Sequence, residues 1–394
     1  MTVRITTTIL IAGFLFVGLR ARAIAQTNGT QSEAQPIPAS TDAGRFFSFD
    51  PVGSQSTRPT GINVLGAITG YYYDVTGTAH GFLRDPNGRI ITFDGPDSAR
   101  DLGLSGTVPA AVNDFGSVAG SYYDASGQHH GFVRLNDCPV NRPKNCTLTT
   151  FDVPSAAGGT NPTDINLQGA ITGYYYDANY AVHGFERAPD GDLTFFDVPG
   201  AGNTAGQGTM PTGINLRGAI AGNFSYPSAT ANGVKPNLWI PPIFSGFLRN
   251  PEGKITTFAP PTATSIGVQV AINLTGAVAG YYWAGGGIAR GFVRESNGTY
   301  STFDGANYLP CCISTYPTSI NDLGAVTGSY NDGLFINHGF VRTSYGVITS
   351  FDAPGASQTI YQGTLPVAIN LDGAITGSYL DANSVSHGFV RLGN

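Results

Sequence analysis

Aspartate and histidine are the residues of this chain whose spacing could do chemistry, because they recur as pairs six residues apart. A carboxylate beside an imidazole can serve acid–base catalysis, contribute to a metal site, or hold a hairpin closed. Five equal pairs favour the structural role, and the alternative is that one pair is recruited for acid–base chemistry. The pairs are Asp74 and His80, Asp124 and His130, Asp177 and His183, Asp332 and His338, and Asp381 and His387.

Two further copies of the pattern lack both members of the pair. Tyr226 and Ala284 stand where the aspartate is expected, and Ser245 and Arg290 stand where the histidine is expected. Residues that are present together and absent together are expected to touch. The histidines are also expected roughly 10 Å, or two strand spacings, outside the innermost strand, so they cannot converge on one metal ion. The sequence therefore predicts no metal site.

A longer repeat contains these pairs. An asparagine, two variable residues and a glycine precede an apolar stretch, as in "INLQGAITG" (165–173), with a period of about 51 residues. Asparagine followed three residues later by glycine suits a type I turn, so each copy predicts a hairpin. The seven copies begin at Asn63, Asn113, Asn166, Asn215, Asn273, Asn321 and Asn370.

Each copy holds four short segments, typified by "PTGIN", "GAITGYYYD", "HGFVR" and "ITTFD". Folding the third and fourth about the two central residues of turns such as "PNGR" (86–89) predicts one pairing throughout. The expected pairs are Phe82 with Phe93, Phe185 with Phe196, Phe247 with Phe258, Phe292 with Phe303, and Phe340 with Phe351.

The last copy ends after its third segment, and "RFFSFDP" (45–51) supplies a spare fourth segment near the other end. Four strands per copy, seven copies and this split unit predict an all-β fold. The expected architecture is a seven-bladed β-propeller of four-stranded antiparallel blades, with the last blade closed by the N-terminal strand.

The first strand of each blade is expected to be innermost, because a small residue precedes its final isoleucine or valine in most copies. Asp164 is the exception and the one acid expected near the axis. An arginine on the third strand recurs in every copy, and its stem is expected to pack on the sheet with the charge outward. These arginines are Arg84, Arg134, Arg187, Arg249, Arg294, Arg342 and Arg391.

The run of "GAITG", aspartate and "HGF" motifs resembles the bacterial extracellular HAF-repeat proteins, which are named for a His-Ala-Phe motif. The resemblance covers about residues 46–394, with His-Gly-Phe in place of His-Ala-Phe. It implies export from the cell and a β-repeat fold. It implies no activity, because none is established for that family.

The N-terminus has the pattern of a secretory signal. Arg4 precedes an apolar run over residues 5–19, and Ala23-Ile24-Ala25 suits a cleavage site. We expect a signal peptide at 1–25, a flexible lead-in at 26–44 and the propeller at 45–394. The apolar run is too short to span a bilayer, so no membrane span is expected.

Without residues 1–25 the chain has 17 basic and 26 acidic side chains, which argues against a nucleic-acid partner. A secreted or periplasmic monomer is predicted.

The four cysteines of an exported chain are expected to be oxidised. Cys138 and Cys146 bracket an insertion and are expected to form a disulfide. Cys311 and Cys312 are adjacent, and a vicinal disulfide is the remaining option for them within the chain.

The repeat is broken in copies four and five, where the two tryptophans of the chain lie. Aromatic side chains on propeller loops can stack on sugar rings or anchor a protein partner. The alternative is that Trp239 packs its own long loop onto the blade. The predicted binding residues are Trp239, Trp283, Tyr281 and Tyr282, with Asp164 as a further candidate.

The leading functional hypothesis is a non-catalytic secreted binding module for a glycan or a protein, acting through the loops of blades four to six. No cofactor is expected, because the sequence has no phosphate-binding loop, zinc-spaced cluster or serine elbow. One alternative is a polysaccharide-active glycosidase or lyase, which would need two carboxylates at one site. The other is a structural envelope or matrix protein.

Overall fold

In a computed structural model of the chain, the described residues are 44–98, 106–137, 146–226, 243–285, 287–305 and 314–393. All of them belong to the second of two compact units, Met1–Ala39 and Ser40–Asn394. Every regular element within these ranges is a β-strand, which confirms the prediction of an all-β fold. None of the described residues belongs to a helix long and apolar enough to cross a membrane. The predicted signal peptide lies outside the described residues.

The strands follow the seven sequence copies, which we call repeats 1 to 7, with four strand positions in each. The first strands are β2 (Ser56–Ile62), β6 (Gly106–Val112), β10 (Thr160–Ile165), β14 (Gly208–Ile214), β18 (Ser265–Ile272), β22 (Thr315–Ile320) and β26 (Thr364–Ile369). The second strands are β3 (Ile68–Tyr73), β7 (Val118–Tyr123), β11 (Ile171–Tyr176), β15 (Ile220–Tyr226), β19 (Val278–Trp283), β23 (Val326–Asn331) and β27 (Ile375–Leu380).

The third strands hold the segment typified by "HGFVR", and the fourth strands hold the segment typified by "ITTFD" up to its phenylalanine. The third strands are β4 (Ala79–Arg84), β8 (His129–Arg134), β12 (Val182–Arg187), β16 (Ile243–Arg249), β20 (Ala289–Arg294), β24 (Asn337–Arg342) and β28 (Ser386–Arg391). The fourth strands are β5 (Ile90–Phe93), β9 (Leu148–Phe151), β13 (Leu193–Phe196), β17 (Ile255–Phe258), β21 (Tyr300–Phe303), β25 (Ile348–Phe351) and β1 (Phe46–Phe49).

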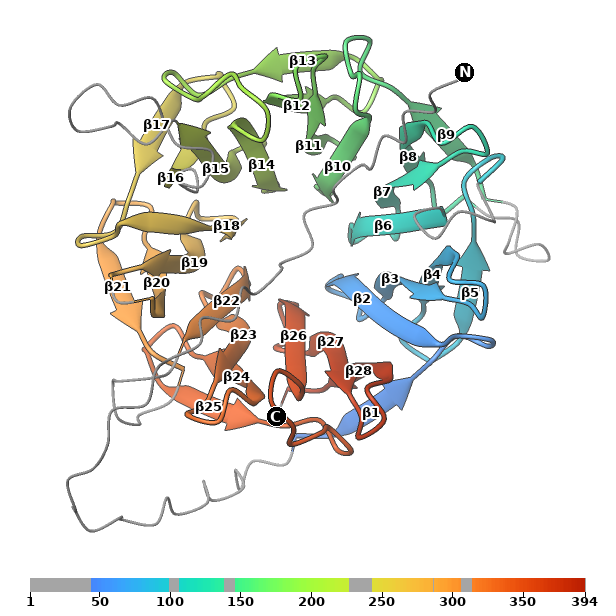
Figure 1. Cartoon of the computed structure of the whole chain (residues 1–394), viewed down its shortest axis with the longest axis vertical. Helices are drawn as coiled ribbons and strands as arrows, with labels where there is room; N and C mark the ends of the chain where they lie inside the picture. Colours follow the sequence, from blue (N-terminus) through green and yellow to red (C-terminus); the bar gives the residue numbers. More distant parts are fainter. Residues whose placement is uncertain are drawn as a thin grey trace, which may run out of the picture. The chain divides into compact units, whose positions relative to one another are not determined.

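The four strands of a repeat pair in sequence order as an antiparallel sheet, for example β18-β19-β20-β21. In repeat 7 the fourth place is taken by β1, which pairs with β28 from Phe46 opposite Arg391 to Phe49 opposite Gly388. Figure 1 shows the first strand of each sheet toward the centre and the fourth strand on the rim. Because the strands alternate in direction, the second-to-third loops and the connections between repeats share one side, which we call the loop face.

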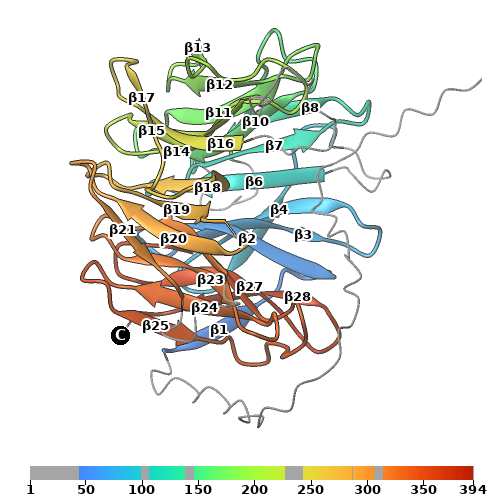
Figure 2. The same cartoon turned by 60° about the vertical axis from the view of Figure 1, so that its left-hand side comes forward.

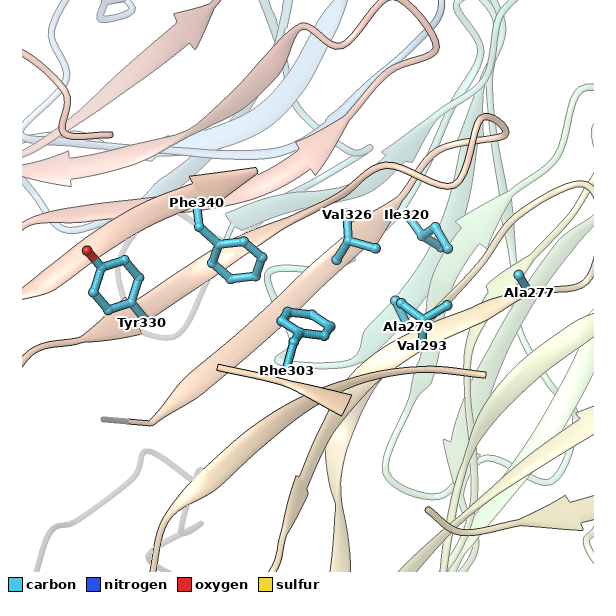
Figure 3. Close-up of a cluster of buried hydrophobic side chains, with 8 residues drawn as sticks. All are labelled: Ala277, Ala279, Val293, Phe303, Ile320, Val326, Tyr330 and Phe340. Carbon is cyan, nitrogen blue, oxygen red and sulfur yellow. The ribbon is translucent and has the colours of Figure 1, made fainter. Parts of the chain in front are cut away.

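The hydrophobic core lies between neighbouring sheets. Figure 2 shows the sheets side by side, and Figure 3 shows one interface, between repeats 5 and 6. There Phe303 of β21 packs on Phe340 of β24 with ring centroids 5.8 Å apart, and both side chains are buried. Burial of such aromatic side chains is the main stabilising term for a fold made of small sheets packed on one another.

The turn asparagines do more than make turns. Each side-chain Oδ1 accepts a hydrogen bond from the backbone N–H four residues later, as Asn63 does from Ala67 at 2.8 Å. Each Nδ2 donates to the carbonyl oxygen of the next asparagine, as Asn63 does to Asn113 at 3.0 Å. Asn370 donates to the carbonyl oxygen of Asn63, 307 residues away, at 3.1 Å. Corresponding bonds join the intervening asparagines in order.

The predicted pairing of phenylalanines across the third and fourth strands is wrong by one residue. Phe93 lies opposite Gly81, and Phe82 lies opposite Thr92. The turn between them has three loop residues because Gly88 adopts a φ of +94°, which shifts the register by one. The fourth-strand phenylalanines instead pack on the third strand of the next repeat, as Phe93 does on Phe132 with centroids 6.1 Å apart.

Candidate functional site

Each histidine of the repeated pairs lies between two carboxylates rather than beside one. In repeat 1, His80 Nε2 is 3.5 Å from Asp74, while Nδ1 is 2.9 Å from Asp94. The closer carboxylate belongs to the "TFD" segment after the fourth strand, and the sequence reasoning missed it. The corresponding partners are Asp152, Asp197, Asp352 and Asp50, whose oxygens lie 2.7 to 3.0 Å from Nδ1 of His130, His183, His338 and His387.

The signal for the second carboxylate was in the sequence. Repeat 4 has Ser245 in place of histidine and Ala259 in place of the "TFD" aspartate, so neither member is present. Repeat 5 keeps its aspartate, Asp304, and Arg290 makes two hydrogen bonds to it at 3.0 and 2.7 Å. The second aspartate is therefore retained where a basic residue faces it.

The first aspartate of each pair mainly holds its own loop. Asp124 Oδ1 accepts hydrogen bonds from the backbone amides of Ser126 and Gln128. The hydrogen bond from the Ser126 hydroxyl, with those from Gln128 and His130, lowers the pKa of Asp124 to about 2. Burial opposes protonation of His130, but its hydrogen bonds to Asp152 and Asp124 raise its pKa. Each of the five clusters thus links the second-to-third loop, the third strand and the aspartate after the fourth strand.

The predicted outward charge of the third-strand arginines is wrong. The guanidinium carbon of Arg134 lies 4.9 Å from the centre of the Phe93 ring, and the residue is 2% exposed. The seven arginines each stack in this way on a fourth-strand phenylalanine of the preceding repeat, at 4.8 to 5.4 Å. A guanidinium can lie flat on an aromatic face and still donate hydrogen bonds at its edge, which explains arginine here.

The predicted aromatic binding residues do not form one exposed group among the described residues. Tyr282 is 2% exposed and belongs to the core, so it is not available to a ligand. Tyr281 is half-buried against Tyr316, with ring centroids 5.1 Å apart, and Trp283 lies 6.2 Å from Tyr281. Trp239, within 227–242, lies outside the described residues.

The contact between Tyr281 and Trp283 is a feature of the repeat. The same edge-on geometry joins Tyr71 to Tyr73 in repeat 1 and Tyr174 to Tyr176 in repeat 3. What repeat 5 adds is an irregularity in β18 between Ile266 and Val270. The carbonyl of Val268 there accepts a hydrogen bond from Asn223.

Exposed aromatic side chains occur on the loop face at backbone positions that suit glycine. The fourth residue of the second-to-third loop has a positive φ in the six repeats in which the structure describes it; it is Gly77 at +81° in repeat 1 and Tyr180 at +60° in repeat 3. In repeat 6 it is Phe335 at +60°, 43% exposed. A bulky residue in the left-handed region is strained, and such strain persists where the surroundings or a function require it.

Phe335 meets a second residue of this kind. Tyr361, in the connection from repeat 6 to repeat 7, has a φ of +62° and is 52% exposed. The two rings lie 5.8 Å apart, and the Tyr361 amide donates to the Phe335 carbonyl oxygen. Leu334 and Ile360 extend the exposed apolar surface, and we call these four residues the Phe335 patch. The sequence reasoning missed it because phenylalanine and tyrosine do not signal a left-handed backbone.

The other candidate, Asp164, lines a cavity of about 450 Å³ formed by the first strands. Its Oδ1 accepts a hydrogen bond from the Ile165 amide at 2.8 Å, and its Oδ2 accepts one from Ile214 of the next repeat at 2.9 Å. Burial raises the pKa of Asp164 to about 6. Asp164 thus lies apart from the loop-face aromatics, on an inner strand.

The predicted disulfides remain predictions. Cys138, Cys311 and Cys312 lie outside the described residues, and Cys146 lies just before β9 beside Arg134. Among the described residues, no group of three His, Cys, Asp or Glu side chains is arranged to hold a metal ion.

No family model matches the sequence, and no curated protein matches it. Solved structures of β-propeller proteins do resemble its fold. A streptogramin B lyase aligns with a TM-score of 0.53 and 16% identity, over 89% of this chain and 98% of that one. Virginiamycin B lyase from Staphylococcus aureus aligns with a TM-score of 0.52 and 14% identity, over 88% and 99%. At this identity the likeness shows the fold alone.

Proposed function

We propose that the chain is a closed, seven-bladed β-propeller, exported from the cell, that binds carbohydrate without catalysis at its loop face. The Phe335 patch carries the proposal. Export follows the signal-like N-terminus and the resemblance to HAF-repeat proteins, and closure follows the pairing of β1 with β28. The chain acts as a secreted or periplasmic monomer.

The strained backbone at Phe335 points to a ligand because a second ring, that of Tyr361, lies beside it. Tyr180 has the same φ in repeat 3, but there Gly206 takes the place of Tyr361. Glycine occupies this position without strain in repeats 1 and 2, at Gly77 and Gly127. A phenylalanine there costs on the order of 1–3 kcal/mol of backbone strain and leaves apolar surface in water. Neither cost stabilises the fold, so ligand binding accounts for the residue better than packing does.

A carbohydrate ligand suits the Phe335 patch better than a protein partner with a broad contact surface. Two neighbouring rings offer flat faces to the C–H groups of sugar rings. Beside them, Gln362 donates a hydrogen bond to the Ser384 hydroxyl at 2.6 Å, so amide and hydroxyl groups suited to sugar hydroxyls border the rings. The sequence predicted the loops of blades four to six, and the proposed site lies on the same face, in repeat 6 and its connection to repeat 7.

Phe335→Gly tests the proposal, because it removes the ring and relieves the backbone together. We expect the melting temperature to hold or rise, while binding on a glycan array falls at least about tenfold. Tyr180→Gly is the matched control: Tyr180 has a φ of +60° at the same loop position in repeat 3, so this variant receives the same relief and loses an exposed ring outside the Phe335 patch.

Wild-type protein that binds no glycan, or a Phe335→Gly protein that binds as well as wild type, contradicts the proposal. Incubating the bound glycans with the protein and looking for cleaved products separates binding from catalysis. Product formation favours the alternative of a glycosidase or lyase. N-terminal sequencing of the exported protein tests cleavage after Ala25, and peptide mapping without reduction tests the Cys138–Cys146 disulfide.

A further inference from the structure

The cavity at the inner strands has the size of a small-molecule site. Its volume of about 450 Å³ lies within the usual range for ligand pockets. All seven first strands contribute to its wall, which is mostly glycine, alanine, valine, isoleucine and proline. These small side chains leave room for a ligand and offer it an apolar surface.

Asp164 breaks the symmetry of this wall. It is the one ionisable side chain among the described residues that line the cavity. The same position holds Gly61, Ala111, Gly213, Ala271, Ser319 and Ala368 in the other repeats. Each carboxylate oxygen of Asp164 accepts one backbone amide hydrogen and keeps a further lone pair. Its negative charge has no basic side chain facing it within the cavity wall.

Three threonine hydroxyls of the wall already use their hydrogens in bonds to backbone carbonyl oxygens. Thr163 donates to the Pro211 carbonyl oxygen at 3.1 Å, and Thr318 donates to the Pro366 carbonyl oxygen at 3.1 Å. Thr212 likewise donates to the carbonyl of Val270. A hydroxyl whose hydrogen is used in this way offers only lone pairs to a ligand. These hydroxyls and the Asp164 carboxylate therefore present acceptors, which a ligand rich in N–H donors would complement.

From this set of groups we infer that the cavity binds a small organic ammonium ion, with the cationic head on Asp164 and the apolar body against the inner strands. An ammonium head supplies three N–H donors and one positive charge, which matches one carboxylate in a wall that also holds acceptor hydroxyls. A divalent metal ion fits less well, because it prefers six or more oxygen ligands including several carboxylates. The inference is independent of carbohydrate binding at the Phe335 patch.

The probe is benzylammonium, with benzyl alcohol as a neutral molecule of the same shape. We expect isothermal titration calorimetry on the whole protein at pH 7.5 to show saturable binding of benzylammonium and none of the alcohol. Asp164→Asn keeps the side-chain size and removes the charge, and it should weaken binding at least about tenfold. Asp372→Asn removes a carboxylate at an exposed turn residue outside the cavity wall and should leave binding unchanged.

A readout at the carboxylate itself distinguishes direct contact from a change in stability. Burial holds the pKa of Asp164 at about 6, and a bound ammonium ion should lower it. Carbon-13 NMR of the labelled aspartate carboxyl should show this shift on addition of benzylammonium. Equal binding to the Asp164→Asn protein, equal binding of the alcohol, or an unmoved carboxyl titration overturns the inference. Stabilisation by magnesium or calcium that depends on Asp164, without any by benzylammonium, overturns it in favour of a metal site.

Discussion

When a carboxylate accepts hydrogen bonds from its own loop, the folded state favours its ionised form. Asp124 is such a residue, and its folded pKa of about 2 lies below the ordinary value near 3.8. Folding therefore favours the charged form of Asp124. The stabilisation is present above about pH 3.8 and is lost as the pH falls toward 2. His130 has the opposite sign: its raised pKa contributes stability at low pH, which fades as the pH rises through the folded pKa.

Asp124→Asn should therefore flatten the acid side of the stability curve. Between about pH 5 and pH 2.5 the wild-type protein should lose more free energy of unfolding than the variant, because only the wild type must protonate this carboxylate. Urea denaturation at both pH values measures the difference. Asp372→Asn, at an exposed turn residue, should show the wild-type dependence. Identical acid dependence in all three proteins would exclude the assigned role of Asp124.

A contact between two residues was predictable from the sequence where both residue types change together from one repeat to another. The contact between Asp124 and His130 was predicted because repeats 4 and 5 lack the counterparts of both residues. Asp152, the nearer partner, was missed because only residues of one hairpin were compared, although its counterpart is also absent in repeat 4. Phe335 could not be found in this way, because its backbone angle depends on the loop around it rather than on its residue type.

Neighbouring sheets are joined by a recurring stack of three side chains. Phe303 at the end of β21 packs on Phe340 of the next repeat. The Arg342 guanidinium lies 4.9 Å from the centre of the Phe303 ring. The Arg342 edge donates hydrogen bonds to Ser301 and to the carbonyl of Thr343. One planar cation thus satisfies an aromatic face and two oxygens, which a lysine ammonium cannot do.

Arg342→Lys should lower the free energy of unfolding by about 1–2 kcal/mol, since it loses the stacked face and a partly buried hydrogen bond while keeping the charge. Chemical denaturation measures the change. Arg217→Lys, at an exposed turn position, should change stability little. Equal effects at the two positions would show that charge alone, rather than stacking, matters at the interface.

At the level of elements, the sequence period predicted the order of the strands well. Hairpin register was predictable only as far as the turn type was known. A left-handed Gly88 added one residue to the turn and moved Phe93 from Phe82 to Gly81. The contacts between sheets were not predictable in detail, because the sequence pattern shows which residues repeat but not which face of a sheet meets which neighbour.

Over the whole molecule, repeat 7 is distinguished by its fourth strand, β1, which comes from the opposite end of the sheet-forming chain. His387 of β28 bonds to Asp50, which follows β1, at 2.7 Å. The equivalent bond in repeat 3 joins His183 to Asp197 within one continuous stretch, at 2.8 Å. The same contact therefore links two strands of one hairpin in repeat 3, whereas in repeat 7 it links the N-terminal strand β1 to β28.

Asp50→Asn should destabilise the protein more than Asp197→Asn does. We expect about 1 kcal/mol for Asp197→Asn, and a larger loss for Asp50→Asn because no turn holds β1 against β28. Thermal unfolding ranks the two variants. Hydrogen exchange should show faster opening of residues 46–50 in the Asp50 variant alone. Equal losses without faster exchange would mean that β1 is held by its backbone pairing and needs no fastening by this contact.

The pairing of β1 with β28 also bears on circular permutation, in which the termini are joined and new ones are opened elsewhere. The Leu392 amide donates to the Arg45 carbonyl oxygen at 2.9 Å, so the two ends of the sheet-forming chain are neighbours. A short peptide could bridge them, and new termini could be opened in another connection between repeats. Such circular permutants should fold, because each repeat makes the same contacts with its neighbours wherever the chain begins. The present starting point would then be one of several equivalent ways to order the repeats.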